Sequence, residues 1–345
     1  MSRLHVSRGM AILLTALVAF PTLAGTRLAT GAGCTGNSVV CENLLPGNPS
    51  SEWDIGGAGS TGIEGFATDI SVNVGGTAHF KVNTNAANWN LAIYRLGYYQ
   101  GNGARLVQPA FAPTAALPQK QPACLTDTTS GITDCGNWAE SASWAVPANA
   151  VSGIYIALLT RTDTGGQNHI VFVVRNDAST SDLLFKTSDT TWQAYNQYGI
   201  GDFYEGGPIN HSYKVSYNRP FVTSICCGRD WVFSNEYPMI RFLEMNGYDV
   251  SYVAMADLDR NPSTLLQHKA MLSVGHDEYW SNAERSAVES ARAAGVNLAF
   301  FSGNTMYWKT RWENSIDGSS TPYRTLVCYK ETWDNAQTDP ADPPT

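Results

Sequence analysis

The sequence predicts a two-domain protein, in which a β domain is followed by an α/β domain. From about residue 53 to residue 176, short apolar runs are broken by turn residues, and no stretch there is helical in pattern. From residue 182 onward, strand-like runs alternate with helical patterns, an order that builds a parallel sheet covered on both faces. A chain of 345 residues with 43% hydrophobic residues is long enough for both domains.

Residues 1–33 are typical of a signal peptide and leader. Two arginines precede an apolar run over residues 10–20, and small residues follow Pro21. The run is too short to cross a bilayer. A lipoprotein anchor at Cys34 is the alternative, but the three residues before it lack the leucine that usually opens such a site. We therefore expect a secreted, extracellular protein without a membrane span.

The charge of the chain limits which classes of partner it can bind, and its cysteines bear on the redox compartment in which it folds. A formal net charge of -8, without a Lys/Arg cluster, argues against a nucleic-acid partner, which needs a basic face. Disulfides are reasonable in an exported protein. The pairs close enough in sequence to form small loops are Cys34 with Cys41 and Cys124 with Cys135. One of the adjacent Cys226 and Cys227 could pair with Cys328.

Residues 34–176 are predicted to form a β-sandwich of immunoglobulin-like type, because short strands repeat without a helical stretch. The predicted strands are 70–74, 78–82, 89–94, 153–160 and 170–174. Gly75 and Gly76 predict a hairpin between the first two strands. The aromatic residues of this domain are expected to pack in its core and along its edges.

A polar linker at residues 177–181 separates this domain from an α/β domain over residues 182–345. The predicted strands are 183–187, 250–254, 270–274 and 296–301, and the predicted helices are 237–246, 262–268 and 281–294. Ser281 is expected to cap the last helix, with Glu284 reaching back to complete a capping box, and Gly295 is expected to end it.

Polar residues collect after the predicted strands of this sheet. In an open parallel sheet, ligands bind beyond the carboxyl ends of the strands. The residues in such positions are Thr191, Trp192, Tyr195, Tyr198, Tyr204, Asp257, Asp259, the segment 275–280, Ser302, Gly303 and Asn304. Their convergence predicts a functional site at this edge of the sheet.

The segment 275–280, GHDEYW, is the sharpest single feature. We expect a strand to turn here straight into a helix, which would hold His276, Asp277 and Glu278 rigidly as a metal ligand and a general acid or base. The alternative is that His276 and Glu278 only satisfy local backbone groups. No serine or cysteine occupies this turn, so a covalent mechanism of the α/β-hydrolase or amidotransferase kind is disfavoured.

One long connection is rich in tyrosine, with Tyr195, Tyr198, Tyr204, Tyr213 and Tyr217. Such a cluster usually packs under a loop. A hard, highly charged ion lowers the pKa of a phenol, and ferric iron does so better than zinc. An H-x-E turn facing these tyrosines is therefore compatible with an oxygen-rich iron site.

Three motifs carry a family resemblance: TWQAYN at 191–196, GHDEYWS at 275–281 and SGNTMYW at 302–308. Softer matches in the first half are IEGF at 63–66 and IYRLGYY at 93–99. Through them, the chain resembles the large-subunit family of N,N-dimethylformamidase, including its exported relatives. The resemblance covers most of the chain after the signal segment. It implies a second domain like the class I glutamine amidotransferase-like fold.

The resemblance also implies a metal site. In that family two tyrosines and one glutamate hold a mononuclear ferric ion, Fe(3+), and the matching residues here are Tyr195, Tyr204 and Glu278. Tyr204 rests on a weaker match, so Tyr213 and Tyr217 are the alternatives for the second tyrosine.

Further site residues follow from the same resemblance. His276 and Asn304 match the family's histidine and asparagine beside the ligands, and with Glu278 they are the expected catalytic residues. The family's domain continues beyond the last residue of this sequence and contributes another carboxylate near the metal. The resemblance therefore implies that the site as written is incomplete.

The leading hypothesis is an exported, iron-dependent amidohydrolase-like protein that hydrolyses the C–N bond of a small-molecule amide with metal-activated water. The alternative is a secreted or cell-surface binding module with an inactive α/β domain, whose exposed aromatics would contact glycans. A third hypothesis is a zinc or manganese hydrolase that uses His276, Glu278 and an aspartate such as Asp257. The sequence names neither the substrate nor the oligomeric state, and a homo-oligomer is compatible with it.

Overall fold

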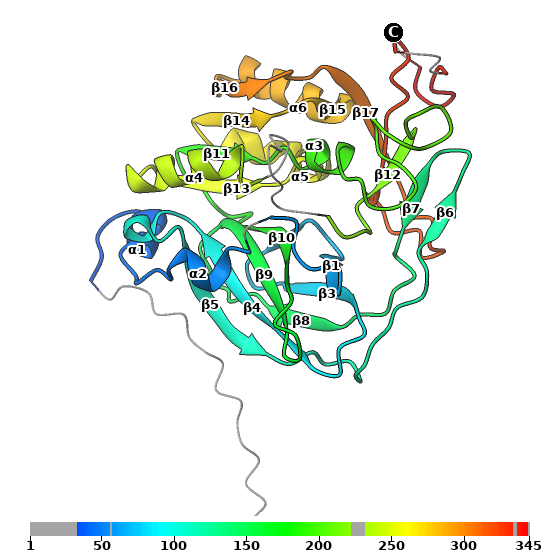
Figure 1. Cartoon of the computed structure of the whole chain (residues 1–345). Coiled ribbons are helices and arrows are strands. Elements are labelled where there is room, and N and C mark those ends of the chain that lie inside the picture. Colours follow the sequence, from blue (N-terminus) through cyan, green and yellow to red (C-terminus); the bar gives the residue numbers. More distant parts are fainter. Residues whose placement is uncertain (1–32, 56, 222–231, 334–336, 344–345) are drawn as a thin grey trace, which may run out of the picture.

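The computed structural model describes residues 33–55, 57–221, 232–333 and 337–343. The fold is β-rich and mixed, with several sheets and few helices, and the sheets of the first half lie beneath the parallel sheet of the second (Figure 1). The predicted signal peptide and the Cys226–Cys227 pair lie outside the described residues. Within the described ranges, no helix is long and apolar enough to cross a membrane.

The first half contains two sheets that share one core. Their strand orders are β1-β3-β8 and β2-β10-β9-β4-β5. The strand bounds are β1 Ile63–Ala67, β2 Ser71–Asn73, β3 Thr77–Thr84, β4 Trp89–Leu96, β5 Ala104–Phe111, β8 Ala142–Ala145, β9 Gly153–Arg161 and β10 Gln167–Arg175. Short helical turns accompany them: α1 Ser38–Asn43, α2 Ser50–Trp53 and η1 Tyr99–Gly101. In the core, Phe172 packs against Phe80 and Trp144 at ring-centroid distances of 5.5 and 6.2 Å.

All five strands predicted for this half are confirmed, but the hairpin predicted at Gly75 and Gly76 is wrong. β2 pairs in parallel with β10, whereas β3 pairs with β1 and β8, so the two glycines carry the chain from one sheet to the other. Gly75 has a φ of 78°, and its N–H donates to the carbonyl of Val146. A turn with two glycines is compatible with a hairpin and with a crossing between sheets. The strands that pair with β2 and β3 determine which of the two forms.

The second half is built on a parallel sheet with the strand order β13-β11-β14-β16. The bounds are β11 Leu183–Lys186, α3 Asp189–Ala194, α4 Glu236–Met245, β13 Val250–Val253, α5 Met255–Arg260, η2 Pro262–Gln267, β14 Ala270–His276, α6 Asn282–Ala293 and β16 Asn297–Gly303. The predicted strands and helices are confirmed, and α3 and α5 are additional. The sheet is not covered on both faces at its β16 edge, because Phe300 and Phe301 are 44% and 58% exposed.

A smaller sheet beside it has the order β12-β18-β17-β15. Its strands are β12 Lys214–Ser216, β15 Tyr279–Ser281, β17 Trp308–Glu313 and β18 Thr325–Val327. Because β15 lies between β14 and α6, the prediction that segment 275–280 turns straight into a helix is wrong. The pairing of β15 with β17, which comes later in the chain, keeps these residues extended.

Helix α6 begins at the predicted cap. The Ser281 hydroxyl accepts the N–H of Glu284 at 3.0 Å, and Gly295 follows the helix with a φ of 98°. The second half of the predicted capping box does not form. The Glu284 carboxylate instead lies 3.3 Å from Nζ of the buried Lys186, because a buried ammonium needs an anion more than a neutral amide does.

Both predicted small-loop disulfides are present, Cys34–Cys41 and Cys124–Cys135. The second closes the hairpin of β6 Leu125–Asp127 and β7 Ile132–Asp134, which reaches from the first half toward the second (Figure 1). Cys328 is a buried free thiol, so the suggested disulfide to it is absent. Two disulfides are compatible with an oxidising compartment.

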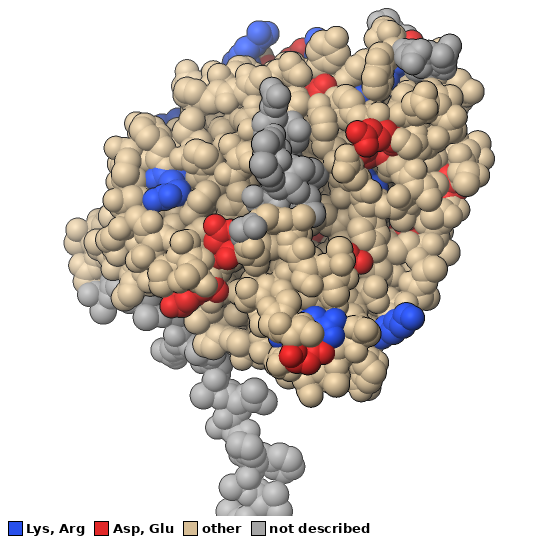
Figure 2. All heavy atoms as spheres, in the orientation of Figure 1, with Lys and Arg blue, Asp and Glu red and all other residues tan. Residues whose placement is uncertain are grey.

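The surface in Figure 2 carries few charged side chains. Lys and Arg residues are scattered there, and the two blue groups near the lower edge lie beside an acidic one, so the described residues of this face form no large basic patch.

Candidate functional site

Glu278 lies just beyond the carboxyl end of the inner strand β14, where two tyrosines converge on its carboxylate. The Tyr195 hydroxyl donates to Oε2 at 3.0 Å, and the Tyr204 hydroxyl lies 2.8 Å from both Oε1 and Oε2. Glu278 is only 4% exposed. Three oxygen-bearing side chains from two separate stretches of the chain therefore meet at one buried point.

Helix α3 and the loop after it carry the two tyrosines. The Phe203 N–H donates to the carbonyl of Ala194 at 3.0 Å, which ties this loop to the end of the helix. The two phenol rings stack with their centroids 4.2 Å apart. From the same helix, the Thr191 hydroxyl accepts the N–H of Glu278 at 3.1 Å. One short helix thus helps to position all three side chains.

His276 and Asn304 extend this group toward solvent. Nε2 of His276 is 3.2 Å from Oε2 of Glu278 and 3.1 Å from Nδ2 of Asn304. The parallel pairing of β14 and β16 places His276 opposite Gly303, which brings the next residue alongside. Asn304 has a φ of 49°, a left-handed conformation that asparagine tolerates better than most residues. The five predicted site residues therefore form one connected group.

Hydrogen bonding decides the charge of Glu278. Burial raises the pKa of this carboxyl, but hydrogen bonds from His276 and Tyr204 outweigh burial and leave the pKa below its ordinary value. Burial, reinforced by the nearby Glu278 charge, raises the pKa of the Tyr204 phenol. At neutral pH the chain alone thus presents an ionised carboxylate beside a neutral Tyr204 phenol, a combination that attracts a cation.

Lys330 is a site residue that the sequence did not predict. Its side chain is fully buried, and Nζ lies 3.4 Å from the ring centroid of Tyr204 and 4.6 Å from that of Trp333. Among the described residues, Nζ has no hydrogen-bond partner. Burial lowers the pKa of this ammonium to about 8. A single lysine after a short apolar strand gives no signal in the sequence, so only the fold reveals it.

A buried ion pair supports the turn that carries Glu278. Lys186, at the end of β11, donates to Oδ1 of Asp277 at 2.7 Å, and both side chains are fully buried. The same ammonium lies 4.3 Å from the ring centroid of Trp280. Removing one partner of such a pair leaves an uncompensated buried charge, at a cost of about 3–5 kcal/mol, so loss of either residue should destabilise the turn.

The other tyrosines of the cluster lie away from Glu278. The Tyr217 hydroxyl donates to Asp189 at 2.8 Å, and the Tyr198 hydroxyl donates to Glu64 at 3.2 Å. Tyr213 stacks on Tyr329, and its hydroxyl has no hydrogen-bond partner among the described residues. The structure therefore brings Tyr204, and neither Tyr213 nor Tyr217, to the Glu278 carboxylate.

The aspartates that follow β13 serve other contacts. Oδ1 of Asp257 accepts from Ser71 at 2.7 Å and from Arg175 at 3.1 Å, while Asp259 accepts from Ser281 and Trp312. Across the described ranges, no group of three or more His, Cys, Asp or Glu side chains is arranged to hold a metal ion. The zinc or manganese set that was considered from the sequence is thus not assembled.

A cavity of about 410 Å³ lies apart from this group. It is lined by Asp259, Trp312 and Tyr323 among others, and none of the five predicted site residues lines it. The chemistry of the oxygen-rich group, rather than cavity size, therefore identifies the candidate site.

Comparisons with known proteins give one informative match. Residues 90–345 match a family described as N,N-dimethylformamidase beta subunit-like, C-terminal. No curated protein matches the sequence.

Two solved structures have weak likenesses to this chain. One is an AA10 lytic polysaccharide monooxygenase from Streptomyces lividans, at 20% identity and a TM-score of 0.19, covering 30% of this chain and 56% of its own. The other is a family 123 glycoside hydrolase from Clostridium perfringens, at 12% identity and a TM-score of 0.16, covering 59% of this chain and 33% of its own. The chain thus spans only part of either protein, and neither likeness carries an argument.

Proposed function

The chain belongs to the N,N-dimethylformamidase beta subunit-like family, and from that premise we propose that it is an exported, iron-dependent amidohydrolase-like protein. Family membership supports a hydrolase that acts on a carbon–nitrogen amide bond. The observation that carries the iron proposal is the convergence of the Tyr195 and Tyr204 phenols on the Glu278 carboxylate, at 3.0 and 2.8 Å.

The donor set fits a ferric ion. Phenol and carboxylate oxygens are hard donors, and a trivalent ion lowers the pKa of a phenol enough to ionise it. In the chain alone, the Tyr204 hydroxyl oxygen lies 2.8 Å from both oxygens of Glu278, so phenol and carboxylate oxygens already face one another, as ligands of one cation would. Tyr195, Tyr204 and Glu278 are therefore the proposed ligands.

When bound, ferric iron would supply a Lewis acid that polarises an amide carbonyl and lowers the pKa of water. The neighbouring residues handle the proton and the substrate. Nε2 of His276, 3.2 Å from Glu278, can hold a proton and give it to the leaving amine. The exposed amide of Asn304 would donate to the substrate oxygen.

We also propose the finer fold assignments, an immunoglobulin-like sandwich in the first half and a class I glutamine amidotransferase-like sheet in the second. Two sheets around a shared core support the first assignment. The parallel order β13-β11-β14-β16, with the site beyond the end of β14, supports the second.

The decisive experiment is the metal content and visible spectrum of the purified protein, before and after reconstitution with ferric iron. We expect stoichiometric iron, a tyrosinate charge-transfer band, and release of amine from small amides such as N,N-dimethylformamide. Glu278→Ala should lose both the iron and the band. The matched control is Glu205→Gln, since this carboxylate follows Tyr204 directly but accepts from Gln197 instead.

Retention of stoichiometric iron by Glu278→Ala would exclude Glu278 as a ligand. A wild-type protein that stays colourless and metal-free after reconstitution would instead favour the secreted binding module with an inactive α/β domain.

A further inference from the structure

The two proposed tyrosine ligands need a device that fixes them relative to each other, because each lies on a different segment. Tyr195 ends helix α3, and Tyr204 lies on the loop that follows. We infer that Arg219 is the positioning residue for this pair, an inference that rests on the proposed iron site.

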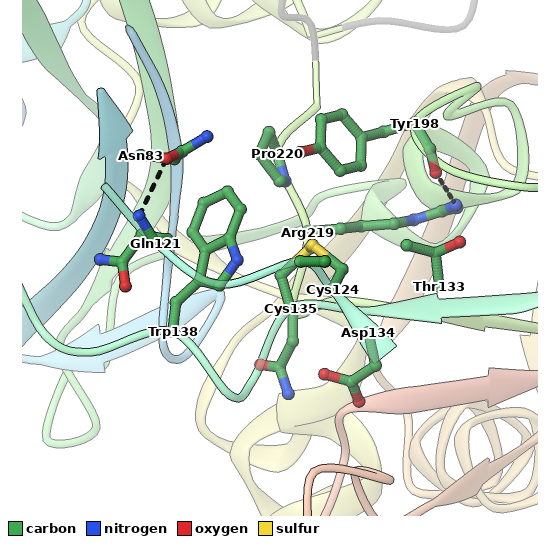
Figure 3. The surroundings of a disulfide bond; sticks show 12 residues. Asn83, Gln121, Cys124, Thr133, Asp134, Cys135, Trp138, Tyr198, Arg219 and Pro220 are labelled. Carbon is green, nitrogen blue, oxygen red and sulfur yellow. Dashed lines mark hydrogen bonds between the residues drawn. A yellow bond between two sulfur atoms is a disulfide. The ribbon is translucent and has the colours of Figure 1, made fainter. Parts of the chain in front are cut away.

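The guanidinium of Arg219 joins these segments through their carbonyl groups. Nη1 donates to Tyr198 at 2.7 Å (Figure 3) and to Gly201 at 3.1 Å. Nη2 donates to Gln193 at 3.0 Å. Nε donates to Ser216 at 3.1 Å. The carbonyls of Gln193 and Tyr198 flank Tyr195, and that of Gly201 lies three residues before Tyr204. One side chain therefore binds the chain just before Tyr195 and at two points between Tyr195 and Tyr204.

Arg219 is suited to this role because its donors are rigid and its charge is buried. The side chain is fully buried, and no carboxylate among the described residues forms an ion pair with it. Burial lowers the pKa of the guanidinium to about 10, so it stays protonated at neutral pH. A planar guanidinium presents five N–H groups in fixed directions, whereas a lysine ammonium is a single point. Lysine would keep the charge but could not bridge three segments.

The hydrogen bonds of the loop transmit the position of Gly201 to Tyr204. The N–H groups of Tyr204 and Glu205 both donate to Oδ1 of Asp202, at 2.6 and 2.7 Å. The Phe203 N–H is bound to the carbonyl of Ala194. A shift of Gly201 would therefore move the Tyr204 hydroxyl relative to Glu278.

The disulfide-closed hairpin also contacts this loop. The Ile200 N–H donates to the Thr133 hydroxyl at 3.0 Å, beside the Cys124–Cys135 disulfide (Figure 3). A Cβ on Gly199 would lie 2.1 Å from that hydroxyl oxygen, so hairpin and loop are in close contact. Arg219 and the hairpin thus both hold the loop through hydrogen bonds.

The experiment compares Arg219→Lys with Arg324→Lys. Arg324 is also fully buried and donates to the carbonyls of Ala67 and Tyr217, but it makes no bond to residues 193–204. Arg219→Lys should weaken iron binding by about 10- to 100-fold, as loss of a residue that orients metal ligands usually does, and should shift the tyrosinate band. Arg324→Lys should retain the wild-type affinity and band.

A second measurement needs no metal. Hydrogen exchange of the iron-free protein should show faster exchange of the Phe203, Tyr204 and Glu205 amides in Arg219→Lys, with unchanged exchange in β9 and α6. Arg324→Lys should leave those three amides as in the wild type. Wild-type exchange and a wild-type band in Arg219→Lys would overturn the inference. A wild-type protein that binds no iron would overturn the proposed function, and exchange alone would then decide whether Arg219 positions the loop.

Discussion

Glu278 is a buried carboxyl that remains ionised. It accepts hydrogen bonds from Tyr195, Tyr204 and His276, and bonds of this kind hold its pKa down against the effect of burial. Because Glu278 is already ionised, only the phenols of Tyr195 and Tyr204 must lose protons before all three side chains can bind one cation as anions. Iron binding at this point should therefore release protons and weaken as pH falls.

The second tyrosine ligand can be identified with a pair of matched variants. Tyr204→Phe keeps the ring but removes the hydroxyl that contacts Glu278, so it should lose most of the tyrosinate band and bind iron at least about 10-fold more weakly. Tyr213→Phe removes a buried hydroxyl without a partner among the described residues and should change neither property. Iron titration followed by absorbance measures both effects. Loss of the band in Tyr213→Phe alone would transfer the ligand role to Tyr213.

At the scale of elements, the connection from β14 to α6 links the site to the helix behind it. β15 keeps Tyr279–Ser281 extended, and the Ser281 hydroxyl then caps α6 while donating to Asp259 at 2.8 Å. Glu284, in the first turn of α6, lies against Lys186 beneath the Glu278 turn. Helix and turn should therefore lose stability together.

Ser281→Ala removes the cap of α6 and should lower the free energy of unfolding by about 1 kcal/mol, because the Glu284 N–H loses its acceptor. Urea denaturation followed by far-UV circular dichroism measures this change. Ser286→Ala, at an exposed position of the same helix, is the control and should stay within about 0.5 kcal/mol of the wild type. Equal stability of the two variants would show that the cap contributes nothing.

At the scale of the whole molecule, the two halves are packed as one body. Val171 and Val173 of β10 belong to the same core cluster as Phe185 of β11. Arg95 of β4 and Glu244 of α4 form a fully buried ion pair at 2.7 Å. Because a hairpin of the first half also supports the loop with Tyr204, the site in the second half depends on the first.

The packing of the first half predicts a pH dependence of stability. Burial lowers the pKa of His169 from about 6.5 to about 4, and its Nε2 lies 2.6 Å from the carbonyl of Trp53. Between these values the unfolded chain binds a proton that the folded chain does not. The contribution of His169 to the free energy of unfolding is therefore complete above pH 6.5. It falls by about 1.4 kcal/mol per pH unit as the pH drops toward 4.

Urea denaturation at several pH values checks this prediction. In His169→Gln, the free energy of unfolding should fall less steeply with decreasing pH than in the wild type. The difference in slope should correspond to one proton. Parallel slopes for wild type and His169→Gln would contradict a neutral, buried His169.

Much of this protein was predictable from local sequence. The strands and the helix capped by Ser281 follow from apolar spacing and a capping residue, because both reflect neighbours along the chain. The H-x-E turn and its position after an inner strand pointed to Glu278, and the family motifs pointed to Tyr195, His276 and Asn304.

Only the tertiary structure decided the remaining features. Tyr204 rather than Tyr213 contacts Glu278, and Nζ of Lys330 lies over the ring of Tyr204. At Gly75 the chain passes from one sheet to the other instead of forming a hairpin. Each of these depends on contacts between segments far apart in the chain. Such contacts are stabilised by packing and burial that exist only in the folded chain. The residues next to each position in the sequence therefore do not indicate them.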